Sequence, residues 1–111
     1  MSENTKNVTS EALDQLINES DRPVVVDVWA PWCPPCRRLA PTLEQLAQEF
    51  EGRIVVAKVN IDEDPKAAGK LEVKSIPTLL FYRNGQLVDR RVGASSASEL
   101  KRIFEQLASG K

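Results

Sequence analysis

The chain contains no histidine and only two cysteines, Cys33 and Cys36. Structural zinc and iron–sulfur sites normally need about four Cys or His ligands. This composition therefore disfavours a metal site within one chain and leaves it open only where two chains share a metal. The chain also lacks the glycine fingerprint of a nucleotide-binding loop, so we predict no metal and no bound cofactor, neither nicotinamide nor flavin.

An excess of charge of either sign is absent as well, because 15 basic and 16 acidic residues give a formal net charge of −1. Nucleic acid is therefore a poor candidate partner. No apolar run approaches the length of a membrane span, and the polar first six residues do not resemble a secretion signal. From these absences we expect a cytoplasmic protein that makes no contact with a membrane.

The length of 111 residues, with 41% hydrophobic residues, suits one packed core. We predict a single domain over residues 1–111, a flexible segment at 1–6 and a monomer. Apolar periodicity then alternates between the strand and helix patterns, which indicates an α/β fold. The predicted strands cover residues 7–8, 24–30, 54–61, 78–82 and 86–92. The predicted helices cover 10–18, a long segment after Cys33 that Gly52 closes, 64–71 and a segment after Ser96.

Local signals support several of these boundaries. Asp64-Pro65 is typical of a helix N-terminus, with an N-cap followed by proline at the first helical position. Asn84-Gly85 is a strong hairpin signal, and Ser96 to Glu99 forms a capping box. Pro41 interrupts the apolar stripe of the second predicted helix, where we expect a kink.

The two cysteines lie where a buried strand meets a helix, in the segment Trp32-Cys33-Pro34-Pro35-Cys36. The partial positive charge of a helix N-terminus favours a thiolate at Cys33, and a thiolate is the species that attacks disulfides. Cys36, one turn further on, can then resolve the resulting mixed disulfide. We predict thiol–disulfide exchange with Cys33 as the nucleophile and Cys36 as the resolving thiol; a purely structural disulfide would close only a tiny loop.

Pro34 and Pro35 fit the first helical positions, where their missing N–H groups have no intrahelical partner. They also remove two donors from the Cys33 sulfur, so its first available N–H belongs to Cys36. Fewer donors and a stiffer spacing act in opposite directions on the redox potential, which the sequence leaves undecided.

The segment from Trp29 to Arg37, together with Ile76-Pro77-Thr78 and Asn84-Gly85, closely resembles the thioredoxin family over residues 8 to 108. The resemblance implies a thioredoxin fold, a central mixed five-stranded sheet flanked by four helices. It also implies a dithiol exposed at the end of the second strand, with a cis Ile76–Pro77 bond beside it.

Two charged residues match the family's pattern. Asp27 fits a buried acid behind the second cysteine, whose raised pKa would let it accept the proton of Cys36. The alternative for Asp27 is a carboxylate at a strand irregularity that reaches solvent. Lys58 resembles a lysine near this acid, the alternative being a solvated strand residue.

The resemblance further implies a small apolar surface around the nucleophile on which substrates dock. Its predicted members are Trp32, Ile76, Pro77, Gly93 and Ala94. Trp29, Pro34, Pro35 and Pro41 would shape the motif, with Trp29 packed beneath it. The chain departs from the family at Pro34, where glycine is commoner, and at Ser75, where glycine is frequent before the isoleucine.

The function that follows is a protein-disulfide reductase acting on disulfide-containing proteins. The resemblance implies that an NADPH-dependent flavoprotein, a thioredoxin reductase, supplies the electrons. One alternative is an oxidase or isomerase of secreted proteins, although the histidine such relatives often carry between their cysteines is absent. The other is a binding module in which the dithiol is incidental.

Overall fold

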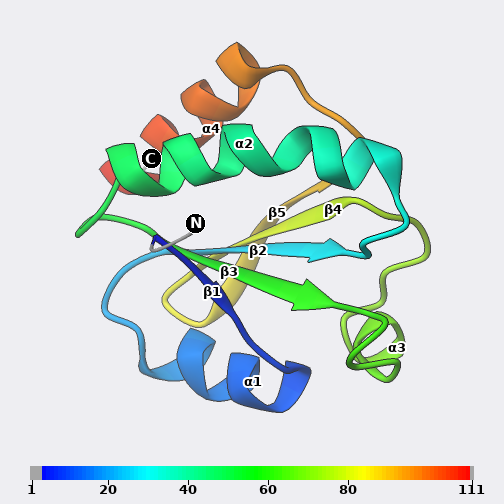
Figure 1. Ribbon diagram of the computed structural model, residues 1–111. Coiled ribbons are helices and arrows are strands. Elements are labelled where there is room, and N and C mark those ends of the chain that lie inside the picture. Colours follow the sequence, from blue (N-terminus) through cyan, green and yellow to red (C-terminus); the bar gives the residue numbers. More distant parts are fainter. Residues whose placement is uncertain (1–3, 111) are drawn as a thin grey trace.

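The computed structural model describes residues 4–110, which form nine elements in the predicted order (Figure 1). The five strands are β1 (Thr5–Asn7), β2 (Val24–Trp29), β3 (Val55–Asn60), β4 (Thr78–Arg83) and β5 (Gln86–Val92). The four helices are α1 (Ser10–Glu19), α2 (Pro34–Glu49), α3 (Ala67–Lys70) and α4 (Ala97–Ser109). Among these residues, no helix has the length and apolar character that a membrane crossing requires.

The strands form one mixed sheet in the order β1-β3-β2-β4-β5. β1, β3 and β2 run parallel, whereas β4 is antiparallel to both β2 and β5. β2 lies at the centre and is buried on both faces, which is why its sequence is an almost continuous run of valines. The predicted fold class, a mixed five-stranded sheet with four helices, is confirmed.

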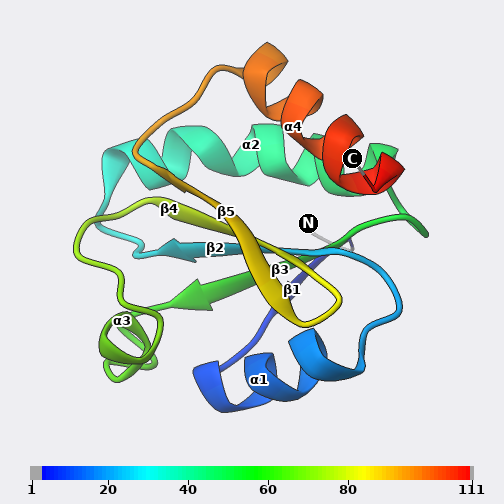
Figure 2. The ribbon, with the colours of Figure 1, turned by 180° about the vertical axis from the view of Figure 1, so that it is seen from behind.

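Helices cover both faces of the sheet. α2 and α4 lie on one face and α1 and α3 on the other, as the two opposite views show (Figure 1, Figure 2). Alternate residues of β2 enter the two cores: Val25 packs with α2 and α4, whereas Val24 and Val26 pack with α1 and α3. The dithiol segment follows β2 directly and therefore starts at the C-terminal end of the central strand, where α2 begins.

Two turn and cap signals are confirmed. Asn84 and Gly85 have φ angles of 53° and 79°, the left-handed pair that a two-residue hairpin turn requires. The Ser96 side chain accepts a hydrogen bond from the N–H of Glu99 at 3.2 Å and caps α4. α2 continues through Pro41 without ending there.

The N-terminal boundary differs from the prediction. Residues 5 and 6 belong to β1, where Thr5 pairs with Val56 of β3, and are not part of a flexible segment. The Thr5 hydroxyl also donates to Glu44 on α2 at 3.2 Å. The predicted strand at residues 7–8 overlaps β1 only at Asn7, because a strand of three residues is too short to show a period that would fix its bounds; residues 1–3 lie outside the described part of the chain.

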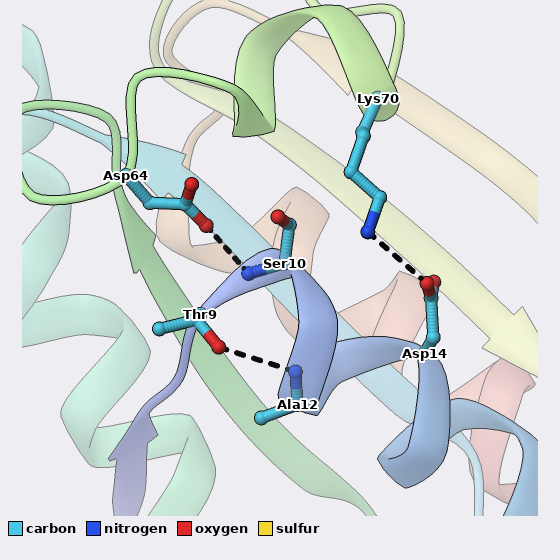
Figure 3. A network of polar contacts seen from close by, with 6 residues as sticks. All are labelled: Thr9, Ser10, Ala12, Asp14, Asp64 and Lys70. Atoms are coloured by element: carbon cyan, nitrogen blue, oxygen red, sulfur yellow. Dashed lines mark hydrogen bonds and ion pairs between the residues drawn. The ribbon is translucent and has the colours of Figure 1, made fainter.

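The expected helix start at Asp64 is wrong. α3 begins at Ala67, and its N-cap, Lys66, makes no side-chain cap. The Asp64 carboxylate instead accepts the N–H of Ser10 at 2.6 Å, in the first turn of α1 (Figure 3). The first N–H groups of any helix lack intrahelical partners, and here a loop distant in sequence supplies one.

Candidate active site

Cys33 and Cys36 form a disulfide at the junction of β2 and α2. Cys33 is the N-cap of α2, and Pro34 and Pro35 occupy its first helical positions. The Cys33 sulfur accepts a hydrogen bond from the N–H of Cys36 at 3.2 Å, which is the first donor the two prolines leave available. The sulfur therefore lies at the positive end of a sixteen-residue helix, where negative charge is stabilised.

The dithiol is less exposed than the resemblance implied. Cys33 is 4% exposed and Cys36 only 1%. Both pack against Ala30, with Trp29, Ile61 and Ile76 around them. A disulfide is apolar, so these side chains cover it well, and Cys33 is the cysteine with the larger remaining access to solvent.

The Ile76–Pro77 peptide bond is cis, and it lies beside the disulfide. The Ile76 carbonyl oxygen is 3.9 Å from the Cys33 sulfur. The Pro77 carbonyl accepts the N–H of Gly93 at 2.8 Å, while the Ser75 carbonyl accepts the hydroxyl of Thr78 at 2.6 Å. Residues far apart in sequence thus meet at one end of the sheet, on the right of Figure 1.

Asp27 lies in the middle of β2 and is fully buried. It pairs in register with Lys58 of β3 and Leu79 of β4, so no strand irregularity leads it to solvent. Its side chain lies on the same face of the sheet as Val25, beneath the helix that carries Cys36. Among the described residues, neither oxygen of its carboxylate has a hydrogen-bond partner.

This environment changes how Asp27 titrates. Burial raises its pKa from 3.8 to about 7, and the positive charge of Lys58 partly opposes the rise. Lys58 is half-buried, with its ammonium 4.5 Å from the centre of the Trp29 ring. A cation–π contact thus places Lys58 and Trp29 together on the sheet face beside Asp27.

The predicted docking residues surround the disulfide unequally. Trp32 is 64% exposed, Ala94 is exposed, Ile76 and Gly93 are half-buried, and Pro77 is buried. The Trp32 indole N–H donates to the Asp62 carboxylate at 2.9 Å. Sequence reasoning missed Asp62; the Asn60-Ile61-Asp62 turn was a weak signal, since the Asp62 N–H donates to the Asn60 side chain at 2.9 Å.

This geometry defines a class of protein. A disulfide that spans one helical turn at a helix N-terminus, next to a cis-proline and above a buried carboxylate, is the site of a thiol–disulfide oxidoreductase. Within residues 4–110, no three His, Cys, Asp or Glu side chains come together as metal ligands.

Comparisons with known proteins agree with this class. Residues 4–106 match the family profile described as Thioredoxin. The chain is 46% identical over 99 residues to Thioredoxin 1 of Nostoc sp., covering 89% of this chain and 92% of the relative. It is 42% identical over 105 residues to Thioredoxin of Pseudomonas aeruginosa, covering 95% and 97%.

A third relative is Thioredoxin M-type, chloroplastic, of Pisum sativum, 43% identical over 99 residues that make up 89% of this chain and 58% of the relative. The chain belongs to the thioredoxin family, and its redox-active Cys33–Cys36 pair makes it a disulfide reductase.

Proposed function

We propose that the chain reduces disulfides of protein substrates, with Cys33 as the attacking thiolate and Cys36 as the resolving thiol. The observation that carries this assignment is the position of the Cys33 sulfur. It sits at the N-cap of α2, accepts the Cys36 N–H and has more access to solvent than Cys36. Both the helix terminus and the hydrogen bond favour the thiolate over the thiol.

The exchange proceeds in two steps. The Cys33 thiolate attacks one sulfur of the substrate disulfide, forms a mixed disulfide and releases the other substrate sulfur as a thiolate. Cys36 then loses its proton and attacks the Cys33 sulfur, which forms the Cys33–Cys36 disulfide and releases the second substrate sulfur. The substrate gains two electrons, and the protein is left in the oxidised form that the structure contains.

Asp27 acts as the proton acceptor for Cys36 in the second step. A base is most effective when its pKa lies near the working pH, and burial raises the pKa of Asp27 to about 7. Support comes also from its place under α2, on the sheet face that Cys36 covers. Lys58 tunes this acid, because its charge lowers the pKa that burial raises.

Substrates dock on the apolar surface formed by Trp32, Ile76, Gly93 and Ala94, and Pro77, which is buried, supports the Ile76 backbone from beneath. Trp32 offers a large exposed ring, which Asp62 holds by its indole N–H. Next to it, the Ile76 carbonyl oxygen lies 3.9 Å from the sulfur of Cys33, the attacking residue. An extended substrate segment laid along this backbone would bring its disulfide to Cys33.

A partner must return two electrons to the Cys33–Cys36 disulfide after each turnover. An NADPH-dependent flavoprotein, a thioredoxin reductase, is the proposed donor, and a monomer is the proposed working form. A reducing compartment suits such a dithiol. We propose the cytoplasm, while the chloroplast-type relative from pea makes a plastid the alternative that cell fractionation would test.

The test is reduction of insulin disulfides by the wild-type chain and by Cys33→Ser and Cys36→Ser. Both variants should lose steady-state turnover, but only Cys36→Ser should accumulate a covalent mixed disulfide, visible as a mass shift removed by dithiothreitol. The assignment is unambiguous because the chain has no third cysteine. Mixed disulfides on Cys33→Ser instead would reverse the two roles, and a double variant that keeps the cellular function would favour a binding module.

A further inference from the structure

The segment that carries Ile76 is held at both ends by β5 and by Gly93, the residue that follows this strand. At its downstream end, the N–H of Gly93 donates to the Pro77 carbonyl at 2.8 Å. At its upstream end, the Arg90 guanidinium donates to two carbonyls, that of Glu72 at 3.1 Å and that of Leu71 at 3.2 Å. β5 and Gly93 therefore bracket residues 73–77, the segment between α3 and β4.

The two carbonyls bonded by Arg90 follow the last turn of α3. Leu71 is the C-cap of α3 and Glu72 is the next residue, so both carbonyls lie where the helical hydrogen-bond pattern ends, and an arginine from another element bonds both of them here. Glu72 has a φ of 57°, in the left-handed region that non-glycine residues seldom adopt. A planar guanidinium can bond two neighbouring acceptors at fixed geometry, whereas a lysine ammonium offers no such fork.

The anchored backbone leads directly to the dithiol. Val73 follows Glu72 and is 8% exposed, packed in the core on the α1 and α3 face. Three residues later, the Ile76 carbonyl lies 3.9 Å from the Cys33 sulfur. In both ribbon views this segment and the β2–α2 junction lie at the same end of the sheet (Figure 1, Figure 2).

We propose that Arg90 is a positioning residue for disulfide exchange, because its paired hydrogen bonds to Leu71 and Glu72 fix the Ile76 backbone beside Cys33 for docking of a protein substrate. The inference rests on the proposed function, in which that backbone receives the substrate. The Arg90 guanidinium bonds the carbonyls of Leu71 and Glu72, and it acts on the reaction only through the segment it holds. Its loss should therefore weaken docking while leaving the reactivity of the dithiol intact.

Arg91 provides a matched control on the same strand. Arg90 pairs in register with Leu80 and faces α3, whereas Arg91 pairs with Leu79 on the opposite face. Arg91 makes a local ion pair with Asp89 at 3.2 Å. The Arg91 variants make the same side-chain changes on the same strand, and they leave the contacts of Arg90 with residues 71 and 72 in place.

The experiment mixes the fully reduced chain with an excess of oxidised insulin and measures the single-turnover rate against insulin concentration, for wild type, Arg90→Lys, Arg90→Gln, Arg91→Lys and Arg91→Gln. Both Arg90 variants should need about 3- to 10-fold more insulin for half-saturation, with the limiting rate within about 2-fold of wild type, because only ground-state docking is lost. Reaction with 5,5′-dithiobis(2-nitrobenzoate), which needs no docking, should be unchanged. Amide hydrogens of residues 73–76 should exchange faster in the Arg90 variants.

Three outcomes would overturn the proposal: unchanged half-saturation in both Arg90 variants, equal shifts in the Arg91 variants, or an equal loss of rate toward the small disulfide. A lowered unfolding midpoint with unchanged half-saturation would leave Arg90 a merely structural residue and would also overturn it. Arg90→Lys keeps the charge and most of the side chain, so it tests the fork even where Arg90→Gln folds poorly. Failure of the wild-type chain to reduce insulin would instead overturn the proposed function.

Discussion

The two faces of β2 are built differently although they come from one strand of six residues. Toward α1 and α3 the strand presents only Val24, Val26 and Val28, all buried in an apolar core. Toward α2 it presents Val25, Asp27 and Trp29. Because side chains alternate along a strand, a single residue step separates an ordinary hydrophobic core from a buried carboxylate on the face that α2 covers.

The two faces therefore contribute differently to the protein, one to its stability and the other to its active site. The α1 and α3 face adds stability through apolar burial, whereas the α2 face gives up some stability to hold a group that can accept a proton near neutral pH. Lys58 belongs to the second face, since it shares that side of β3 with Val56. The charge of Lys58 moderates the cost of burying this carboxylate, although burial has the larger effect on its pKa.

We expect the largest change in stability when a carboxylate is placed on the α1 and α3 face of β2. Val26→Asp places a carboxylate at a fully buried position. The residues paired with it on the neighbouring strands are Ala57 and Leu80, and neither is a lysine that could moderate its charge. We expect the free energy of unfolding at pH 8 to fall by at least about 4 kcal/mol, measured by urea denaturation.

Val26→Ala is the control for lost volume and should cost only about 1–3 kcal/mol. Equal stability of Val26→Asp and wild type would mean that the two faces do not differ in the way proposed.

The second prediction removes the carboxylate from the active-site face. The pKa of Asp27 is about 7 when folded and 3.8 when unfolded, so the folded state binds the proton more tightly. The contribution of Asp27 to stability is therefore most favourable below pH 3.8, falls as the pH rises from 3.8 to about 7, and stays low above that pH. Asp27→Asn should raise the free energy of unfolding at pH 8 by about 2–4 kcal/mol, since one pKa unit corresponds to about 1.4 kcal/mol.

The gain should shrink toward zero near pH 4, which a series of denaturant titrations across pH would reveal. Insulin reduction by Asp27→Asn should be slower than by wild type and should lose its pH dependence near 7. A variant that is stabilised but reduces insulin at the wild-type rate would remove Asp27 from the mechanism. The conclusion that the buried carboxylate lowers stability on the α2 face would still hold.

Local sequence signals predicted most of the fold, and they failed where partners come from afar. The hairpin at Asn84-Gly85 and the cap at Ser96 each involve residues that lie within four positions of one another, so the local sequence is enough to predict both. Asp64 carries an equally clear cap signal, yet its carboxylate serves α1 across 54 positions. A capping side chain reveals that it can accept a hydrogen bond but not which helix supplies the donor.

The same limit applies to the candidate site. Cys33, Cys36 and Pro77 were predictable because the motif and the resemblance name them. Asp62 and Arg90 were not, because their partners, the Trp32 indole and the carbonyls after α3, meet them only once the sheet has formed. Surface polar residues carry no period, and their roles follow from tertiary contacts that single-sequence patterns do not encode.

The third prediction gives the smallest effect and contrasts the two carboxylates directly. On the α1 side, the hydrogen bond from the Ser10 N–H lowers the pKa of Asp64, opposite in direction to Asp27. Asp64 therefore adds stability above pH 3.8, and this contribution is lost as the pH falls through its lowered folded-state pKa. Asp64→Ala should lower the unfolding midpoint modestly at pH 7, with the deficit vanishing in acid and insulin reduction unchanged.

Asp14→Ala, which breaks the exposed pair with Lys70 at 3.3 Å, is the control and should change the midpoint less, because surface ion pairs contribute little (Figure 3). If Asp64→Ala and Asp27→Asn shifted stability with the same sign at pH 7, the two faces would not treat carboxylates oppositely. If Asp64→Ala slowed insulin reduction, the α1 side would share in the chemistry. Opposite signs, with activity lost only at Asp27, would restrict proton transfer to the face beneath α2.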